Sequence, residues 1–156
     1  MELRDLGLVD AMAIDDVRYG RASSSPPARQ DWAEFFSRSG NRGWGAYLDH
    51  QLIGTIFLQP DPRHPTHVLL RGLWVDEAHR GQGYGHDLVS YALEFADAEC
   101  YRMVKLWVSE HNTAAAALYY SMDFIATGRL RASAHDPFHH LQQLVLDLRQ
   151  ESALQA

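Results

Sequence analysis

The sequence contains one cysteine and has no long uncharged apolar run, and each shortage excludes a class of protein. Cys100 alone cannot form an internal disulfide or an all-cysteine metal site, and we expect it to be a buried small hydrophobic residue. No stretch has the length and apolarity of a membrane-spanning helix, and charged residues follow Met1 directly, so no secretory signal is visible. The sequence therefore predicts a cytoplasmic protein with no membrane partner.

Basic residues are also scarce: the sequence has 14 Lys and Arg against 20 Asp and Glu, which gives a net charge of −6. A nucleic-acid surface would need a basic patch, so we expect no nucleic-acid partner; a cationic small molecule or peptide is compatible with this charge. His64 with His67, and His135 with His139 and His140, form two clusters, but neither has a standard zinc spacing and prolines accompany both. We therefore expect solvated histidines and no metal.

Hydrophobic residues make up 46% of the 156 residues, enough for a substantial core. We expect one domain over residues 1–148 and a polar tail over residues 149–156. The predicted elements are strand Met1–Leu6, helix Leu8–Tyr19, a short helix capped by Asp31, a hairpin of strands Trp44–Leu48 and Leu52–Gln59, strand Thr66–Val75, a helix after the glycines described next, strand Met103–Val108, a helix capped by Asn112, and strands Ile125–Arg131 and Leu141–Leu148.

Two of these predictions concern which side chains are buried. In the first helix, helical spacing places Val9, Met12, Ala13 and Val17 on the inner face. Strand Met103–Val108 is expected to be buried and apolar throughout, as in parallel sheets.

The stretch Leu69–Leu88 carries the strongest chemical signal. An apolar strand ending at Val75 is followed by Gly81, Gly83 and Gly85 and then by an amphipathic helix pattern. Glycines let a ligand approach the backbone closely, and the amides at a helix start attract phosphate. The nucleotide fingerprint GxGxxG and the P-loop both fail here, so the ligand is not fixed by this stretch alone, and a flexible connection stays open as the alternative.

The second informative stretch is Ser109–Phe124. Asn112 can cap a helix whose interior, Ala114–Ala117, has the best helix-forming composition and permits a close approach.

Together the two stretches resemble the signatures of the GNAT N-acetyltransferase superfamily. RGQGYG, Arg80–Gly85, resembles the (Q/R)xxGx(G/A) acyl-CoA loop. NTAAAALYYSMDF resembles NxxAxxLYxxxGF, with matches at Asn112, Ala115, Leu118, Tyr119 and Phe124. Asp123 stands where the family usually has glycine; Asp tolerates the left-handed conformation needed after a helix, so we expect a cost in stability with the fold retained.

The resemblance implies an α/β (α+β) fold: a single-domain GNAT fold with a mixed, mostly antiparallel sheet of six to seven strands, about four helices, and a central parallel strand pair that splays apart. It also implies acetyl-CoA as co-substrate. The pyrophosphate would be bound by backbone amides and the pantetheine arm by a strand edge, with Asn112 and Ala115 on the arm's other side. The amides belong to Arg80, Gly81, Gln82, Gly83, Tyr84 and Gly85, and the strand edge to Trp74 and Val75.

The implied reaction is direct transfer of an acetyl group to a primary amine. Tyr119 is the expected general acid toward the CoA thiolate. Glu77 and Glu110 are the candidate bases, with a water chain or merely solubilising roles as alternatives. An amide at the strand end, that of Val75, is expected to stabilise the oxyanion.

The acceptor amine is not fixed by the sequence. The family's groove corresponds to Tyr19–Phe36 and Arg129–His140, and the acids in or near these segments are Asp15, Asp16, Asp31, Glu34 and Asp136. Two other classes stay open: a non-catalytic acyl-CoA sensor, and a nucleotide- or phosphate-binding protein. Strand Leu141–Leu148 is apolar enough for a homodimer.

Overall fold

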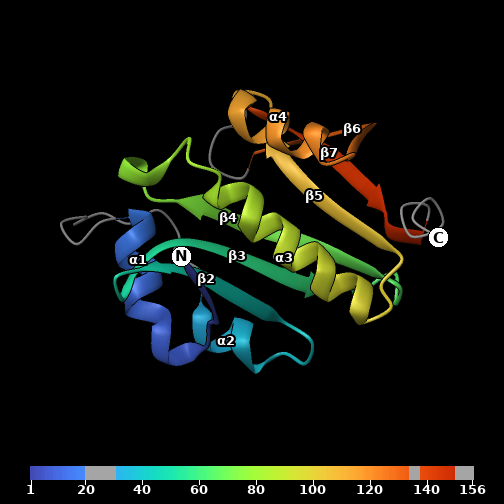
Figure 1. The fold of residues 1–156 in the computed structure, drawn as a ribbon. Helices are drawn as coiled ribbons and strands as arrows, with labels where there is room; N and C mark the ends of the chain where they lie inside the picture. The colour runs from blue at the N-terminus through green and yellow to red at the C-terminus, as the bar shows by residue number, and fades with distance from the viewer. Residues whose placement is uncertain (20–30, 134–137, 150–156) are drawn as a thin grey trace. The chain divides into compact units, whose positions relative to one another are not determined.

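The computed structural model describes residues 1–19, 31–133 and 138–149. Asp136 and residues 20–30 lie outside these ranges, as does most of the predicted tail. The elements are β1 (Glu2–Asp5), the 3-10 helix η1 (Leu8–Asp10), α1 (Ala11–Tyr19), α2 (Trp32–Ser37), β2 (Arg42–Leu48), β3 (Gln51–Pro60), β4 (His67–Val75), the 3-10 helix η2 (Glu77–His79), α3 (Tyr84–Ala98), β5 (Met103–Ser109), α4 (Thr113–Ser121), β6 (Ile125–Ala132) and β7 (His140–Asp147) (Figure 1).

The chain divides into two compact units, and β4 and α3 each have residues in both. The first unit is Met1–Pro60 with Gly72–Ala92, and the second is Asp61–Arg71 with Leu93–Ala156. The hydrogen-bonded strand order is β1-β2-β3-β4-β5-β7-β6. The predicted mixed, mostly antiparallel sheet is confirmed, with β4 and β5 as its parallel pair.

The first unit contains the antiparallel meander β1, β2 and β3. The predicted hairpin is confirmed: Asp49 and His50, with φ of 48° and 65°, connect Leu48 to Gln51. Two successive left-handed residues give a turn whose twist matches that of the flanking strands.

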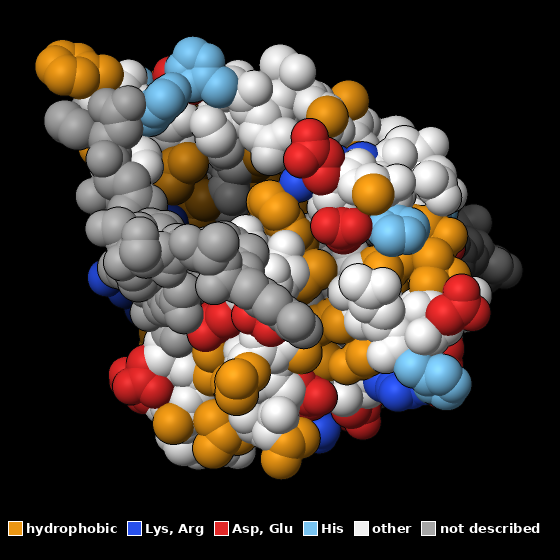
Figure 2. Space-filling view, turned by 90° about the vertical axis from the view of Figure 1, so that its left-hand side faces the viewer, with side chains coloured by type: hydrophobic (Ala, Val, Ile, Leu, Met, Phe, Trp, Pro, Cys, Tyr) orange, Lys and Arg blue, Asp and Glu red, His pale blue; other side chains and the backbone are white. Residues whose placement is uncertain are grey.

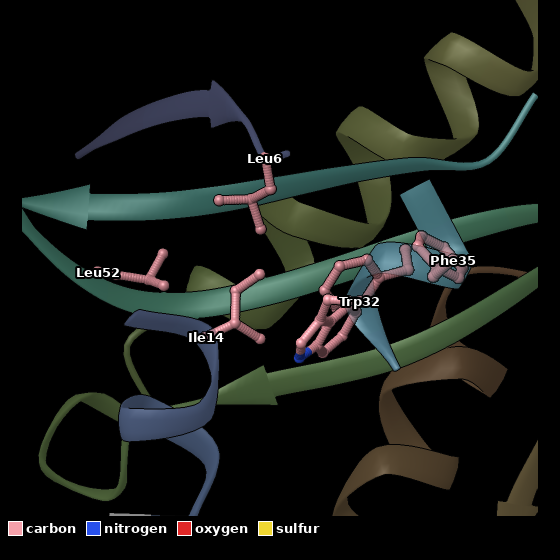
Figure 3. Packing of buried hydrophobic residues seen from close by; sticks show 6 residues of the cluster. Leu6, Ile14, Trp32, Phe35 and Leu52 are labelled. Carbon is pink, nitrogen blue, oxygen red and sulfur yellow. The ribbon is translucent and has the colours of Figure 1, made fainter. Parts of the chain in front are cut away.

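Helices α1 and α2 contribute to an aromatic core in this unit (Figure 3). Trp32, Phe35 and Phe57 are buried, and the ring centroids of Trp32 and Phe57 lie 4.8 Å apart. The Trp32 indole nitrogen donates to Asp15 Oδ1 over 3.0 Å, so the ring is fixed at its polar end too. The predicted cap is confirmed, because Asp31 Oδ1 accepts from the Glu34 amide at 3.1 Å.

The predicted inner face of the first helix is only partly right: Val17 packs against the core, whereas Ala13 is exposed. Val9 and Met12 are 96% and 81% exposed, whereas Ile14 is fully buried. Residues Leu8–Asp10 form a 3-10 turn before α1 begins, so their spacing does not continue in the phase of the α-helix. Figure 2 faces the side where α1 lies in Figure 1 and shows hydrophobic side chains at that surface.

The second unit pairs the start of β4 with β5, from His67↔Met103 to Leu69↔Lys105. Strand β5 then pairs antiparallel with β7, and β7 with β6. The expected burial throughout Met103–Val108 is wrong, since burial alternates and Lys105 and Trp107 are only partly buried. Successive side chains point to opposite faces of a sheet, and only one face of β5 is fully buried.

The inner face of helix α3 is formed by Leu88, Val89, Ala92 and Ala96, which are fully buried. Cys100 follows this helix, and its predicted burial is wrong: it is exposed, with φ of 65°. Its left-handed backbone ends the helix, and the Cys100 amide bonds the Asp97 carbonyl at 3.0 Å. Within the described ranges, no helix is long and apolar enough to cross a bilayer.

Candidate active site

The glycine loop in the first unit adopts a backbone conformation that favours glycine. Gly81 and Gly83 have φ of 75° and 92°, in the left-handed region. A Cβ built on either residue would meet nothing within 4 Å, so the space beside the loop is open. Gly85 lies in the first turn of α3, so two of the three predicted glycines shape the loop itself.

The loop leads directly into α3. The Asp87 amide donates to the Gly83 carbonyl over 3.1 Å, the start of the helical bonding pattern. The first amides of a helix have no partner within it and carry the positive end of the helix dipole. Residues Arg80–Gly83 are exposed, so this end of the helix offers donors to an anion such as a phosphate group.

Hydrogen bonds fix the segment between β4 and the loop. The Asp76 amide donates to the Ile53 carbonyl of β3 at 2.7 Å, and the Asp76 carboxylate lies 3.0 Å from Nδ1 of His79. The Arg80 amide bonds the Glu77 carbonyl at 3.4 Å. These contacts position the loop at the carboxyl end of β4.

Arg80 returns to the end of β4. Its Nε donates to the Val75 carbonyl at 2.8 Å, and its guanidinium carbon lies 4.6 Å from the ring centroid of Trp74. The Trp74 indole nitrogen in turn donates to the Val17 carbonyl of α1 at 2.9 Å. A ligand that pairs with the Val75 carbonyl must therefore share this oxygen with the Arg80 side chain or displace it.

Gly72 is a structural residue of this strand that the sequence reasoning missed. It has φ of 63° inside β4, and its carbonyl accepts from the Thr55 hydroxyl at 3.0 Å. A Cβ at this position would lie 2.7 Å from the Phe57 ring. An isolated glycine within an apolar strand pattern indicates a backbone irregularity, and that signal was present in the sequence.

In the second unit, α4 carries the other signature residues. The predicted cap is confirmed, because Asn112 Oδ1 accepts from the Ala115 amide at 3.2 Å. Ala115 is half-buried and Ala116 is buried, which shows that the alanine face packs closely.

Tyr119 lies on the buried side of α4, with 5% of its surface exposed, whereas Tyr120 is 45% exposed. The Tyr119 ring centroid is 5.5 Å from that of Phe124. Burial raises the pKa of the Tyr119 phenol above its ordinary value. The hydroxyl therefore stays protonated at neutral pH and can act only as a proton donor there.

The two candidate bases belong to different units. Glu77 is exposed in η2 of the first unit. Glu110 follows β5 in the second unit, where its Oε1 lies 3.6 Å from Nδ1 of His140 and 3.9 Å from Nε2 of His111. The Glu110 side chain is 44% exposed, so it is accessible to solvent.

Solved acetyltransferase structures have a similar fold. An N-acetyltransferase from Staphylococcus aureus Mu50 has a TM-score of 0.76 at 19% identity, covering 94% of this chain and 98% of that chain. The ribosomal-protein-S18-alanine N-acetyltransferase from Escherichia coli has a TM-score of 0.75 at 18% identity, covering 94% of this chain and 92% of that chain. At these identities the likeness concerns the fold.

Sequence similarity is higher to curated N-acetyltransferases. The chain is 32% identical to human N-acetyltransferase 8B over 117 residues, which is 73% of this chain and 48% of the relative. It is 40% identical to rat N-acetyltransferase family 8 member 3 over 88 residues, 54% of this chain and 39% of the relative. The chain thus matches about half the length or less of these relatives. Residues 9–124 match the Acetyltransferase (GNAT) family, and this range includes the glycine loop and the whole of α4. The chain belongs to the GNAT acetyltransferase family.

Proposed function

We propose that this protein transfers an acetyl group from acetyl-CoA directly to a primary amine of a small molecule or peptide. The observation that carries the proposal is the exposed loop Arg80–Gly83, whose left-handed residues Gly81 and Gly83 lie directly before the start of α3. Backbone amides in this arrangement suit a pyrophosphate, and the family uses acetyl-CoA as its donor.

The remaining contacts of the donor follow from the family signatures. Trp74 and Val75 bind the pantetheine arm by backbone pairing, and if the Val75 carbonyl is used, the arm shares it with Arg80 or frees Arg80 from it. Asn112 and Ala115 contact the arm through the start of α4. The freed guanidinium of Arg80 would then be available to the phosphates.

The acceptor must lose a proton before it attacks. An alkylammonium has a pKa of about 10.4, so only a few molecules in ten thousand are nucleophilic at pH 7. Glu77 and Glu110 are the carboxylates assigned to this step, directly or through water. Attack on the thioester carbonyl forms a C–N bond and an oxyanion, which the Val75 amide stabilises.

Collapse of this tetrahedral species breaks the C–S bond and expels the CoA thiolate. Tyr119 donates its proton to the sulfur, giving the free thiol and the acetylated amine. A thiol has a pKa of about 8.5 and a phenol about 10, so the transfer to the thiolate is uphill. Burial raises the pKa of Tyr119, which keeps the donor protonated beforehand and adds to the cost of the transfer.

The acceptor class is open among amines that carry positive charge. The net charge of −6 suits a cationic amine, and peptide N-termini, lysine side chains, polyamines, aminoglycosides and amino-acid-like metabolites are the candidates. A structural neighbour is named for acetylating a ribosomal-protein alanine, which places a peptide N-terminus in the first panel of acceptors. The cytoplasmic location and a homodimer through Leu141–Leu148 stay predictions.

A panel of these amines with free-thiol detection tests the proposal. We expect thiol release that requires both acetyl-CoA and an amine, with the acetylated product confirmed by mass spectrometry. Thermal shifts with acetyl-CoA, ATP and NAD separate the other classes, because only ligands of the native state raise the melting temperature. A shift with acetyl-CoA and no turnover on any amine would favour the sensor, and a shift with ATP or NAD alone would reject the acyl-CoA site.

A further inference from the structure

The turn that joins β3 to β4 brings three metal-ligating side chains together, none of which is assigned to acetyl transfer. Asp61, His64 and His67 each offer one ligand atom, and these atoms all lie within 4.8 Å of one another. Tetrahedral zinc with bonds of about 2.1 Å needs ligand atoms about 3.4 Å apart. Small side-chain rotations would therefore complete such a site.

The backbone of this turn is tightly closed. The Asp61 amide donates to the His67 carbonyl at 3.1 Å, the His64 amide to the Asp61 carbonyl at 3.3 Å, and the His67 amide to the His64 carbonyl at 2.9 Å. Pro62 and Pro65 restrict the turn further by fixing φ. The ligands are thus held close together before any ion binds, which lowers the entropy cost of binding.

The two imidazoles are also arranged in a way that solvated histidines do not require. Their rings stack with centroids 4.6 Å apart at an angle of 24°. His67 is only partly exposed, and its Nδ1 is buried with no hydrogen-bond partner among the described residues. A buried ring nitrogen without a partner costs free energy unless another group binds it.

We propose that Asp61, His64 and His67 form a binding site for a divalent transition-metal ion such as zinc, with water completing the coordination. One carboxylate and two imidazoles are ligands that zinc accepts, and the charge of Asp61 offsets part of that of the ion. The site stabilises the turn between β3 and β4 and takes no part in acetyl transfer. It is independent of the proposed function.

Lys105 of β5 competes with the metal ion for the Asp61 carboxylate. Its Nζ lies 3.1 Å from Asp61 Oδ2, and the two side chains are only 15% and 11% exposed. The other carboxylate oxygen accepts from the Arg63 amide at 2.9 Å. An ion must share or take Oδ2 from the ammonium, so Lys105 weakens binding and sets its affinity.

Calorimetric titration of the untagged, chelator-treated chain with zinc chloride tests this site. We expect one zinc per chain in the wild type. His64→Gln and His67→Gln should each weaken binding about tenfold or more, and Lys105→Gln should strengthen it severalfold because it removes the competing cation. His64 is exposed, so His64→Gln should fold normally. His86→Gln, an exposed histidine of α3, is the matched control and should bind as the wild type does.

The three variants together decide the outcome. Absence of a zinc heat in the wild type at millimolar ion would overturn the proposal. So would equal affinities in the wild type, His64→Gln and His67→Gln, since the ion would then bind elsewhere. Failure of Lys105→Gln to strengthen binding would contradict the competition. Acetyl transfer, measured with and without chelator, should be unchanged.

Discussion

Tyr119 is a packing residue for which we propose a chemical role. Its ring is buried against Phe124, while its neighbour Tyr120 is exposed on the same helix. The burial that fixes the ring also raises the pKa of its hydroxyl, which keeps the phenol protonated at neutral pH and makes it a weaker acid. The sequence predicted this residue through its signature, but its burial depends on how α4 is rotated.

Tyr119→Phe should lower kcat by about a hundredfold, because it removes the general acid. The KM for acetyl-CoA should change less than about twofold, since the ring and its contacts stay in place. Steady-state kinetics on the best acceptor measures both constants. Tyr120→Phe is the matched control and should retain the wild-type kcat. Equal turnover of the wild type and Tyr119→Phe from pH 7 to 9 would rule out the general-acid role.

At the scale of the element, α4 ends in a Schellman motif built around Asp123. The Asp123 amide bonds the Tyr120 carbonyl at 3.2 Å and the Phe124 amide bonds the Tyr119 carbonyl at 3.1 Å. Asp123 has φ of 73°, the left-handed conformation that the sequence predicted from the family's glycine. The contact between Phe124 and Tyr119 closes the motif.

Asp123→Gly should raise the free energy of unfolding by about 1 kcal/mol, because glycine adopts this conformation without steric cost. In a protein of this size that corresponds to a rise in Tm of about 2–4 °C. Asp123→Asn, which tolerates the conformation equally well, should leave the Tm nearly unchanged and controls for the lost charge. A Tm for Asp123→Gly at or below that of the wild type would show that the aspartate makes a compensating contact.

Local signals predicted the elements well, and tertiary context decided what the sequence reasoning missed. The caps Asp31 and Asn112 were predictable because each bond spans only three residues. The buried face of α1 was not predictable, because the 3-10 turn before the helix shifts the spacing of its apolar residues. Likewise, the exposure of Cys100 could not be predicted because it depends on the way α3 ends. The bond from Arg80 to the Val75 carbonyl depends on the conformation of the arginine side chain, which the sequence does not specify.

At the scale of the whole molecule, the buried phenol couples stability to pH. The pKa of Tyr119 is raised on folding, so its contribution to stability is complete below about pH 10, the ordinary pKa of tyrosine, and is lost as the pH rises above it. Relative to Tyr119→Phe, the wild type should lose up to about 1.4 kcal/mol for each pH unit above 10. Denaturant midpoints of both proteins at pH 8 and pH 11 measure this. Parallel changes in the two proteins would show that the phenol ionises equally in the folded and unfolded states.

The proposed binding of acetyl-CoA can be tested within the first unit, which contains the glycine loop and the end of β4. Its pyrophosphate is assigned to the glycine loop and its arm to Trp74 and Val75 at the end of β4. The loop's contribution can be isolated by removing the phosphates from the ligand and, separately, the glycine from the loop. Gly128 of β6 offers a matched control, because its φ of 86° is close to that of Gly83 and a Cβ there also meets nothing within 4 Å.

The most direct test is calorimetric titration of acetyl-CoA and of acetylpantetheine, which lacks the pyrophosphate, into the wild type, Gly83→Val and Gly128→Val. The wild type and Gly128→Val should bind acetyl-CoA at least about tenfold tighter than acetylpantetheine, since charge-assisted bonds to phosphate contribute about 1.5–3 kcal/mol each. Gly83→Val should stay folded and lose this preference. Wild-type affinity of Gly83→Val for acetyl-CoA would contradict the assignment of the loop to the pyrophosphate.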